Sequence, residues 1–194
     1  MLEKEIEGDR QLLEKEVRSE EIFGGSLLDL FVDQIEFKEG GGRASREYVR
    51  HPGGVVIVPL LKSDQGEEIL LVRQYRYPPA ELTWELPAGT LEEGESRLEC
   101  ARRELAEETG HGGGKWDRKV DLFTSPGYSD EVLTLFIAEA VEPLGEAEGQ
   151  ESPQDEKLRA RSFSVERILE MAGEGRLRDG KTLAGLFFLL HETL

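Results

Sequence analysis

The chain contains 194 residues, which suits one domain of ordinary size with a small appendage and argues against two full domains. Its 41 acidic and 24 basic residues give a formal net charge of −17, which argues against nucleic-acid or anionic-membrane binding as the main activity. A small nucleotide is compatible with this charge, because salt screens charges beyond ~10 Å and a local basic patch or a bound metal ion can outweigh them.

The amino-terminal part of the chain changes character near residue 22. Residues 1–21 are highly charged, with one apolar cluster at 11–13, so we expect a frayed arm. They lack the apolar core of a signal peptide. From residue 22 to residue 50, short apolar runs flank the glycines 40–42, which predicts a small antiparallel strand unit. Two or three strands cannot form a core alone, so this unit should lie against the main domain or a second subunit.

The middle of the chain predicts a central hairpin. Residues 55–61 form an apolar run typical of a buried strand, a turn follows at 62–66, and a second apolar run covers 69–72. Three consecutive glycines at 112–114 predict a loose connection. Further strands are expected at 83–88, 122–124, 132–138 and 157–163.

One helix can be predicted with both of its ends. Ser96 and Glu99 form a capping box and Gly110 is a natural left-handed stop, so the helix should run from about residue 97 to 109. At about 100° per residue, one face of this helix is apolar and an arc roughly 110° away is acidic. The apolar face carries Leu98, Ala101 and Leu105, and the acidic arc carries Glu104, Glu107 and Glu108.

The acidic arc has the chemistry of a metal site. Glu104 and Glu108 are four residues apart and Glu107 is adjacent, so their carboxylates repel one another by a few tenths of a kcal/mol per pair. Magnesium would offset this repulsion, because it prefers hard oxygen ligands and is usually held by one or two carboxylates. Arg103 could bridge Glu107 or Glu95 in a bidentate fork without occupying the metal position. The alternative is a solvated glutamate-rich face, which is what most charge runs are.

The carboxy-terminal part predicts a loop and two helices. Every ionisable residue from 141 to 156 is acidic, with glycines and prolines interspersed, which is typical of a mobile loop. Helices are expected from residue 164 and over 179–193, where the apolar stripe indicates a core surface rather than a ligand site. Helices and strands around one mixed sheet indicate an α/β sandwich.

The cysteine and the apolar runs bear on the cellular compartment. Cys100 is the single cysteine and cannot form an intramolecular disulfide, so we expect a reducing compartment and a structural role inside the helix. The longest apolar run, 183–190, is too short for a transmembrane helix of ~20 residues. A soluble, cytoplasmic protein is therefore expected.

The segment 89–111 combines these features at fixed spacing. Gly89 is followed six positions later by Glu95, and then by Arg-Glu-Leu-Ala-Glu-Glu-Thr-Gly at 103–110. This constellation resembles the signature of the Nudix hydrolases, which cleave diphosphates linked to another group, and it favours a metal site over a solvated face. His111 departs from the family pattern, in which an aliphatic residue is usual. The resemblance implies an α/β/α sandwich with a mixed sheet.

Further matches extend over almost the whole chain from about residue 22. Pro126 lies sixteen residues after Gly110, and residues 21–30 and 46–53 form two amino-terminal motifs. Together they resemble the ADP-ribose pyrophosphatase branch of the family. The resemblance implies a homodimer, in which residues 1–50 form a dimerising strand unit and residues 51–194 form the Nudix hydrolase domain.

The resemblance also implies the metal site. In it, the carbonyl of Ala88 binds Mg²⁺, or alternatively Mn²⁺, together with Glu104 and Glu108. Glu107 lies nearby as a ligand or an orienting base, and Arg103 belongs to the catalytic set with Glu107 and Glu108.

A glutamate on the acidic loop is implied as the general base. Glu156 corresponds to the residue that activates water, with Glu151 and Asp155 as close rivals. A base that swings in on loop closure need not add its charge to the metal cluster until substrate is present.

Four residues are implied to bind substrate. Arg76 is positioned like the phosphate-binding arginine of the family, and Arg73, expected on the same strand face, could assist, with surface charge as the alternative for both. Arg46 and Glu47 are candidates for the partner's adenosine pocket in the homodimer. The glycines 24 and 25 offer no aromatic side chain to stack on adenine, and the remaining candidates are Phe23, Leu27 and Tyr128.

The implied activity is magnesium-dependent hydrolysis of ADP-ribose to AMP and ribose 5-phosphate. One alternative is the same chemistry on another nucleoside diphosphate sugar, such as GDP-mannose, because nothing in the signature reads the sugar or the base. Two alternatives from other classes are a non-catalytic ADP-ribose-binding sensor, which the intact acidic cluster disfavours, and an acidic interaction domain with no site.

Overall fold

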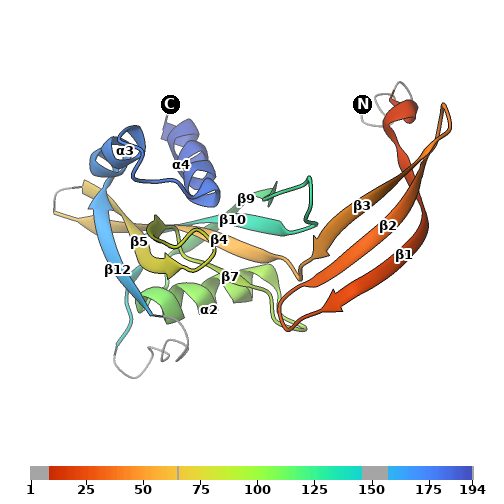
Figure 1. The fold of residues 1–194 in the computed structure, drawn as a ribbon. Helices are drawn as coiled ribbons and strands as arrows, with labels where there is room; N and C mark the ends of the chain where they lie inside the picture. The colour runs from red at the N-terminus through yellow and green to blue at the C-terminus, as the bar shows by residue number, and fades with distance from the viewer. Residues whose placement is uncertain (1–8, 65, 146–156, 194) are drawn as a thin grey trace. The chain divides into compact units, whose positions relative to one another are not determined.

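The computed structural model describes residues 9–64, 66–145 and 157–193, and these form two compact units (Figure 1). One unit contains the chain up to Pro52 together with Ser125–Glu131, and the other contains Gly53–Thr124 and Val132–Leu194. The loop 125–131 thus joins the amino-terminal strands although it is far from them in sequence.

The first unit is built on an antiparallel three-stranded sheet in the order β1-β2-β3. A short 3-10 helix, η1 (Arg10–Leu12), precedes β1 (Glu14–Gly24), β2 (Asp29–Phe37) and β3 (Arg43–Arg50). The predicted antiparallel unit is confirmed, but the frayed arm is wrong from residue 14 onward. All residues of β1 are exposed, and β1 is ordered because its backbone pairs with β2 from Glu14 opposite Phe37 to Gly24 opposite Asp29. Strand pairing uses the backbone, so it tolerates a charged sequence.

The loop that contains Pro126 is held to the end of β3. The Val49 N–H donates to the Tyr128 carbonyl over 2.9 Å, and the Asp130 N–H donates back to the Val49 carbonyl over 3.3 Å. The Asp130 carboxylate also accepts a 2.9 Å hydrogen bond from the His51 N–H. These three hydrogen bonds hold the loop in the first unit.

The second unit is built on a mixed sheet of seven strands among the described residues. Its main order is β12-β5-β4-β10-β9, with β6 paired to β5 and β7 paired to β4, and only the β4–β10 pair is parallel. The strands are β4 (Gly54–Ser63), β5 (Gly66–Arg76), β6 (Glu81–Glu85), β7 (Ala88–Thr90), β9 (Lys115–Phe123), β10 (Val132–Glu139) and β12 (Leu158–Ser164). The predicted central hairpin is confirmed and consists of β4 and β5.

Two predicted loops begin with ordered strands. β8 (His111–Gly112) pairs with β11 (Glu142–Pro143), and Val141 is buried. The predicted loose connection therefore starts after residue 112. The first residues of the predicted acidic loop are ordered because β11 pairs with β8, a contact that the composition of the loop does not reveal. Residues 146–156 lie outside the described residues.

Helices cover both faces of this sheet, with α2 on one face and α3 and α4 on the other (Figure 1). They span Arg97–Thr109, Val165–Gly173 and Gly180–Thr193. Val55 and Ile57 of β4 are buried in the α2 core, while Val56 and Val58 are buried in the core that contains Leu186 of α4. A strand buried on both faces explains the continuous apolar run and confirms the predicted α/β/α sandwich.

Local signals set the ends of the helices. The Ser96 side chain accepts a hydrogen bond from the Glu99 N–H, and the Glu99 carboxylate accepts one from the Ser96 N–H. Gly110 follows the helix in the left-handed conformation, with φ 66°. Both predicted ends of α2 are therefore confirmed. Ser164 caps α3 in a similar way. Across the described ranges, no helix is both long enough and apolar enough to cross a membrane.

Candidate active site

Helix α2 presents its acidic residues to β7. A Cβ added to Gly89 would lie 1.8 Å from Cδ and 1.9 Å from Oε1 of Glu104, so only glycine leaves room for this side chain. The Ala88 N–H donates to Oε2 of Glu108 over 3.2 Å. Glu108 is 6% exposed, so it lies at the buried edge of the helix rather than on an open charged face. The predicted metal ligands Ala88, Glu104 and Glu108 therefore lie together.

Arg103 joins the acidic residues into one network. Its guanidinium forms a bidentate pair with Glu95, with N···O distances of 2.9 and 3.0 Å. The same group donates to Glu104 over 2.7 Å, to Glu107 over 3.2 Å and to the Thr90 carbonyl over 3.2 Å. The predicted fork to Glu95 is present, and the additional contact to Glu104 was not anticipated.

This network stabilises the charged forms of its members. The hydrogen bond from Arg103, which outweighs the opposing effect of partial burial, holds the pKa of Glu95 below its usual range. The bonds to Glu95 and Glu104 raise the pKa of Arg103 well above its usual range. The guanidinium thus offsets part of the carboxylate repulsion, in addition to the predicted metal ion.

The donor set fits a hard divalent cation in its chemistry. Two carboxylates and a neighbouring backbone segment meet beside Gly89, and oxygen ligands of this kind suit Mg²⁺, which keeps positions for water and phosphate oxygens. Within the described part of the chain, no three acidic, histidine or cysteine side chains are already arranged as a metal centre.

Cys100 lies inside α2 and is buried. Burial, followed by the charge of Glu95, raises the pKa of its thiol to about 12. Its Sγ lies 3.5 Å from the Thr90 carbonyl oxygen. An inert, protonated thiol agrees with the predicted structural role.

Arg76 contacts a buried carboxylate that the sequence analysis overlooked. Its guanidinium donates to both oxygens of Glu85 over 2.9 and 2.8 Å, while the side chains of Thr83 and Lys181 also contact Glu85. Burial alone would raise the pKa of Glu85, but the bonds from Arg76 and the charge of Lys181 lower it to about 2. Arg76 is thus a partly exposed side chain that is also paired with a buried acid. The acid at position 85, between the apolar residues Trp84 and Leu86, was the signal that could have revealed this cluster.

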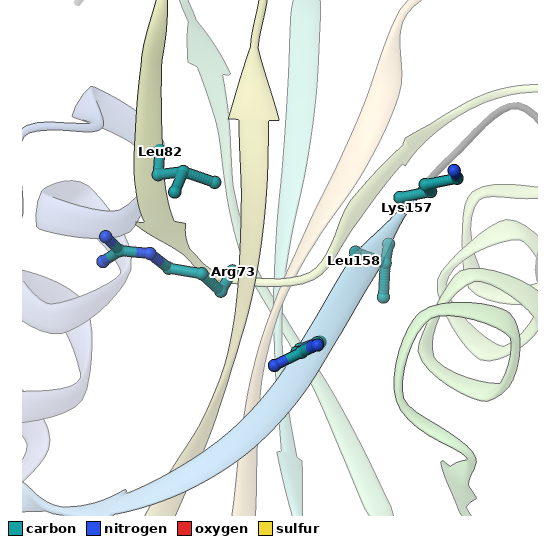
Figure 2. A pocket seen from close by; sticks show the side chains of 5 residues that line it. Arg73, Leu82, Lys157 and Leu158 are labelled. Atoms are coloured by element: carbon teal, nitrogen blue, oxygen red, sulfur yellow. The ribbon is translucent and has the colours of Figure 1, made fainter.

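Arg73 lies on the opposite face of β5 from Arg76, because the two are three positions apart in a regular strand. The prediction of a shared face is wrong. The Arg73 guanidinium lies 5.1 Å from the centre of the Trp84 ring, and Arg159 is directly opposite on β12. Figure 2 shows Arg73 extending away from Lys157. A hollow of about 260 Å³ is lined by Arg73, Leu82, Lys157, Leu158 and Arg159.

The other implied substrate contacts belong to the first unit. Arg46 is paired with Glu14 and donates to the Ser45 carbonyl, and Glu47 is exposed on β3 opposite Val32. The candidates for stacking on a base are exposed side chains of the same unit, namely Phe23, Leu27 and Tyr128. The implied general base Glu156 and its rivals Glu151 and Asp155 lie outside the described residues.

Comparison with known proteins agrees with this geometry. The sequence pattern of the NUDIX domain matches residues 50–186. The chain is 35% identical over 180 residues to an ADP-ribose pyrophosphatase of Bacillus subtilis (strain 168), which covers 93% of this chain and 94% of that protein. It is also 35% identical over 182 residues to a methanol dehydrogenase activator of Bacillus methanolicus, with coverage of 93% and 95%.

A solved structure shares the fold. A crystal structure of an ADP compounds hydrolase matches with a TM-score of 0.77 over 92% of each chain, at 21% sequence identity. At this identity the likeness concerns the fold.

Proposed function

Because the chain belongs to the Nudix family, we propose that it hydrolyses the diphosphate bond of ADP-ribose to AMP and ribose 5-phosphate. The observation that carries the proposal is the meeting of Glu104 and Glu108 with residues 88–89, in a network organised by Arg103. Similarity over nearly the full length to an ADP-ribose pyrophosphatase supports the choice of substrate.

In this proposal a magnesium ion, or manganese in its place, is held by Glu104, Glu108 and the carbonyl of Ala88. When bound, the ion neutralises diphosphate charge, polarises phosphorus and lowers the pKa of a coordinated water. Arg103 keeps Glu104 and Glu107 in place through the bonds described above. Glu107 serves as a further ligand or an orienting base.

Glu156 is proposed as the general base. A water oxygen bonds to one phosphorus, the bridging P–O bond breaks, and Glu156 takes the proton of the attacking water. Arg76 is proposed to contact substrate phosphate with the part of its guanidinium that faces solvent, since its side chain is 40% exposed although it is paired with Glu85. Arg73, on the other face of β5, is a weaker candidate.

A homodimer is proposed through the amino-terminal strands, with Arg46 and Glu47 contributing to the partner's adenosine pocket. The support is β1, an exposed edge strand of eleven residues, because an exposed strand edge is a template for pairing with another chain. A cytoplasmic location also belongs to the proposal, and the buried single cysteine suits such a reducing compartment.

A substrate panel tests the activity. With Mg²⁺ at fixed concentration, we expect AMP and ribose 5-phosphate from ADP-ribose at a higher kcat/KM than for GDP-mannose or dinucleoside polyphosphates. A higher value on GDP-mannose would replace the proposed substrate, and ADP-ribose binding without any hydrolysis would favour the sensor.

Two variants test the assigned roles. Glu108→Gln should abolish turnover and weaken Mg²⁺ binding, whereas Glu156→Gln should slow turnover and leave Mg²⁺ affinity nearly intact. Equal loss of metal binding in both variants would refute the division between metal ligand and general base.

A further inference from the structure

The amino terminus of α4 is bonded to the strand segment that leads into the active site. The Leu86 N–H donates to Oγ1 of Thr182 over 2.8 Å, and both residues are buried. The Thr182 hydroxyl donates in turn to Asp179 over 2.6 Å, and the same carboxylate oxygen accepts from the Thr182 N–H over 3.0 Å. Asp179 therefore fixes the hydroxyl rotamer so that a lone pair of Oγ1 faces Leu86.

The residue before Leu86 is bonded to the same helix end. The Lys181 ammonium contacts the Glu85 carboxylate, which is 2% exposed, and lies 3.1 Å from Asp179. A buried carboxylate with this many donors cannot move without leaving charges unpaired, which is costly at low dielectric. We call Asp179, Lys181 and Thr182 the α4 anchor.

Close packing supports the anchor. A Cβ added to Gly185 would lie 2.4 Å from Cδ1 of Leu86 and 3.0 Å from Cγ2 of Val58. Helix α4 therefore lies directly against Leu86, without an intervening side chain from residue 185.

The other end of the segment lies in the candidate active site. The Pro87 carbonyl accepts from the Ile57 N–H over 2.9 Å, and the Ala88 N–H donates to Glu108. Leu86 and Ala88 are separated by one residue, Pro87, between the end of β6 and the start of β7. A shift of Leu86 is therefore transmitted to Ala88 and Gly89 with little intervening chain to absorb it.

We propose that the α4 anchor is a positioning device for the active site, in which Thr182 and Lys181 act through Leu86 and Glu85 to hold Ala88 and Gly89 against Glu108 and Glu104. This inference rests on the proposed function for its effect on turnover. The anchor lies across the sheet from α2, so its side chains are positioning residues and are not expected to contact substrate.

The test compares Thr182→Val, which removes the acceptor at nearly constant volume, with Thr182→Ser, which restores it. The matched control is Leu189→Ala, which loosens the buried side of α4 near its other end. Each full-length variant is measured for thermal midpoint, for Mn²⁺ affinity by electron paramagnetic resonance without substrate, and for kcat and KM on ADP-ribose.

We expect Thr182→Val to lower kcat by about tenfold or more with little change in KM, because small misplacements of catalytic groups have effects of this size. Its Mn²⁺ affinity should fall severalfold, and Thr182→Ser should recover both values. Leu189→Ala should lower the thermal midpoint while it keeps the Mn²⁺ affinity and kcat of the wild type at temperatures where it is folded.

Wild-type kcat and Mn²⁺ affinity in folded Thr182→Val would overturn the proposal, as would equal losses in Leu189→Ala. If Thr182→Val does not fold, Lys181→Met is measured in the same way, and wild-type values in that variant would also overturn it. If the wild type does not hydrolyse ADP-ribose, the proposed function fails, while the Mn²⁺ comparison still decides the anchor.

Discussion

Glu104 occupies the space in which any residue other than glycine at position 89 would place its Cβ. The two residues are fifteen positions apart, and their contact joins β7 to the acidic arc of α2. The glycine of the signature is therefore explained by close approach, because Gly89 is not among the glycines with positive φ.

Gly89→Ala should displace the Glu104 carboxylate and lower kcat by about 100-fold, in line with the effect of misplacing a catalytic group. Overpacking should also cost about 1–3 kcal/mol of stability, measured by urea unfolding. Gly173→Ala is the matched control, since a Cβ there meets nothing within 4 Å. Wild-type turnover of ADP-ribose by folded Gly89→Ala would show that the position of Glu104 is unimportant.

Arg103→Lys should lower both stability and turnover although the charge is kept. A lysine cannot make the bidentate pair with Glu95 while also reaching Glu104 and Glu107. We expect a loss of about 2 kcal/mol in the free energy of unfolding, because these groups are largely buried. Arg102→Lys, on the exposed neighbour, provides the comparison. If both variants behave alike, the Arg103 network has no special role.

The depressed pKa of Glu85 predicts a defined loss of stability in acid. Its folded value of about 2 lies below the ordinary 4.5, so its contribution is fully present above pH 4.5 and is lost as pH falls toward 2. Between these values the free energy of unfolding should fall more steeply with pH in the wild type than in Glu85→Gln. At pH 7 the variant should be the less stable, because Arg76 and Lys181 lose their buried partner. Parallel curves for the two proteins would contradict the assigned pKa, and Glu93→Gln, at an exposed position, serves as a control.

The exposed β1 strand predicts an assembly that sedimentation can detect. Val17, Ile22 and Phe23 are 46%, 52% and 59% exposed, and burying them against a second copy would remove apolar surface from water. Analytical ultracentrifugation should therefore show a dimer, and Ile22→Lys should weaken it. Leu169→Lys, an exchange on the exposed surface of α3, should leave the dimer intact. A monomeric wild type at micromolar concentration would remove the support for Arg46 and Glu47 acting in a partner's site.

Short-range interactions made part of this molecule predictable. The limits of α2 follow from Ser96, Glu99 and Gly110, which act within one or two turns of the helix. The clustering of Glu104, Glu107 and Glu108 follows from helical periodicity in the same way. The hairpin β4–β5 could be predicted because a strand that is buried on both faces is apolar at consecutive positions, and the sequence shows such a run.

The tertiary structure alone decided which distant groups meet. β1 is a strand because β2 supplies its hydrogen bonds, although its own side chains are charged and exposed. Arg76 is paired with buried Glu85, and Lys181 reaches the same carboxylate across 96 positions of sequence. No local pattern records such a contact, because the free energy of pairing a buried charge depends on which groups surround it after the chain has folded.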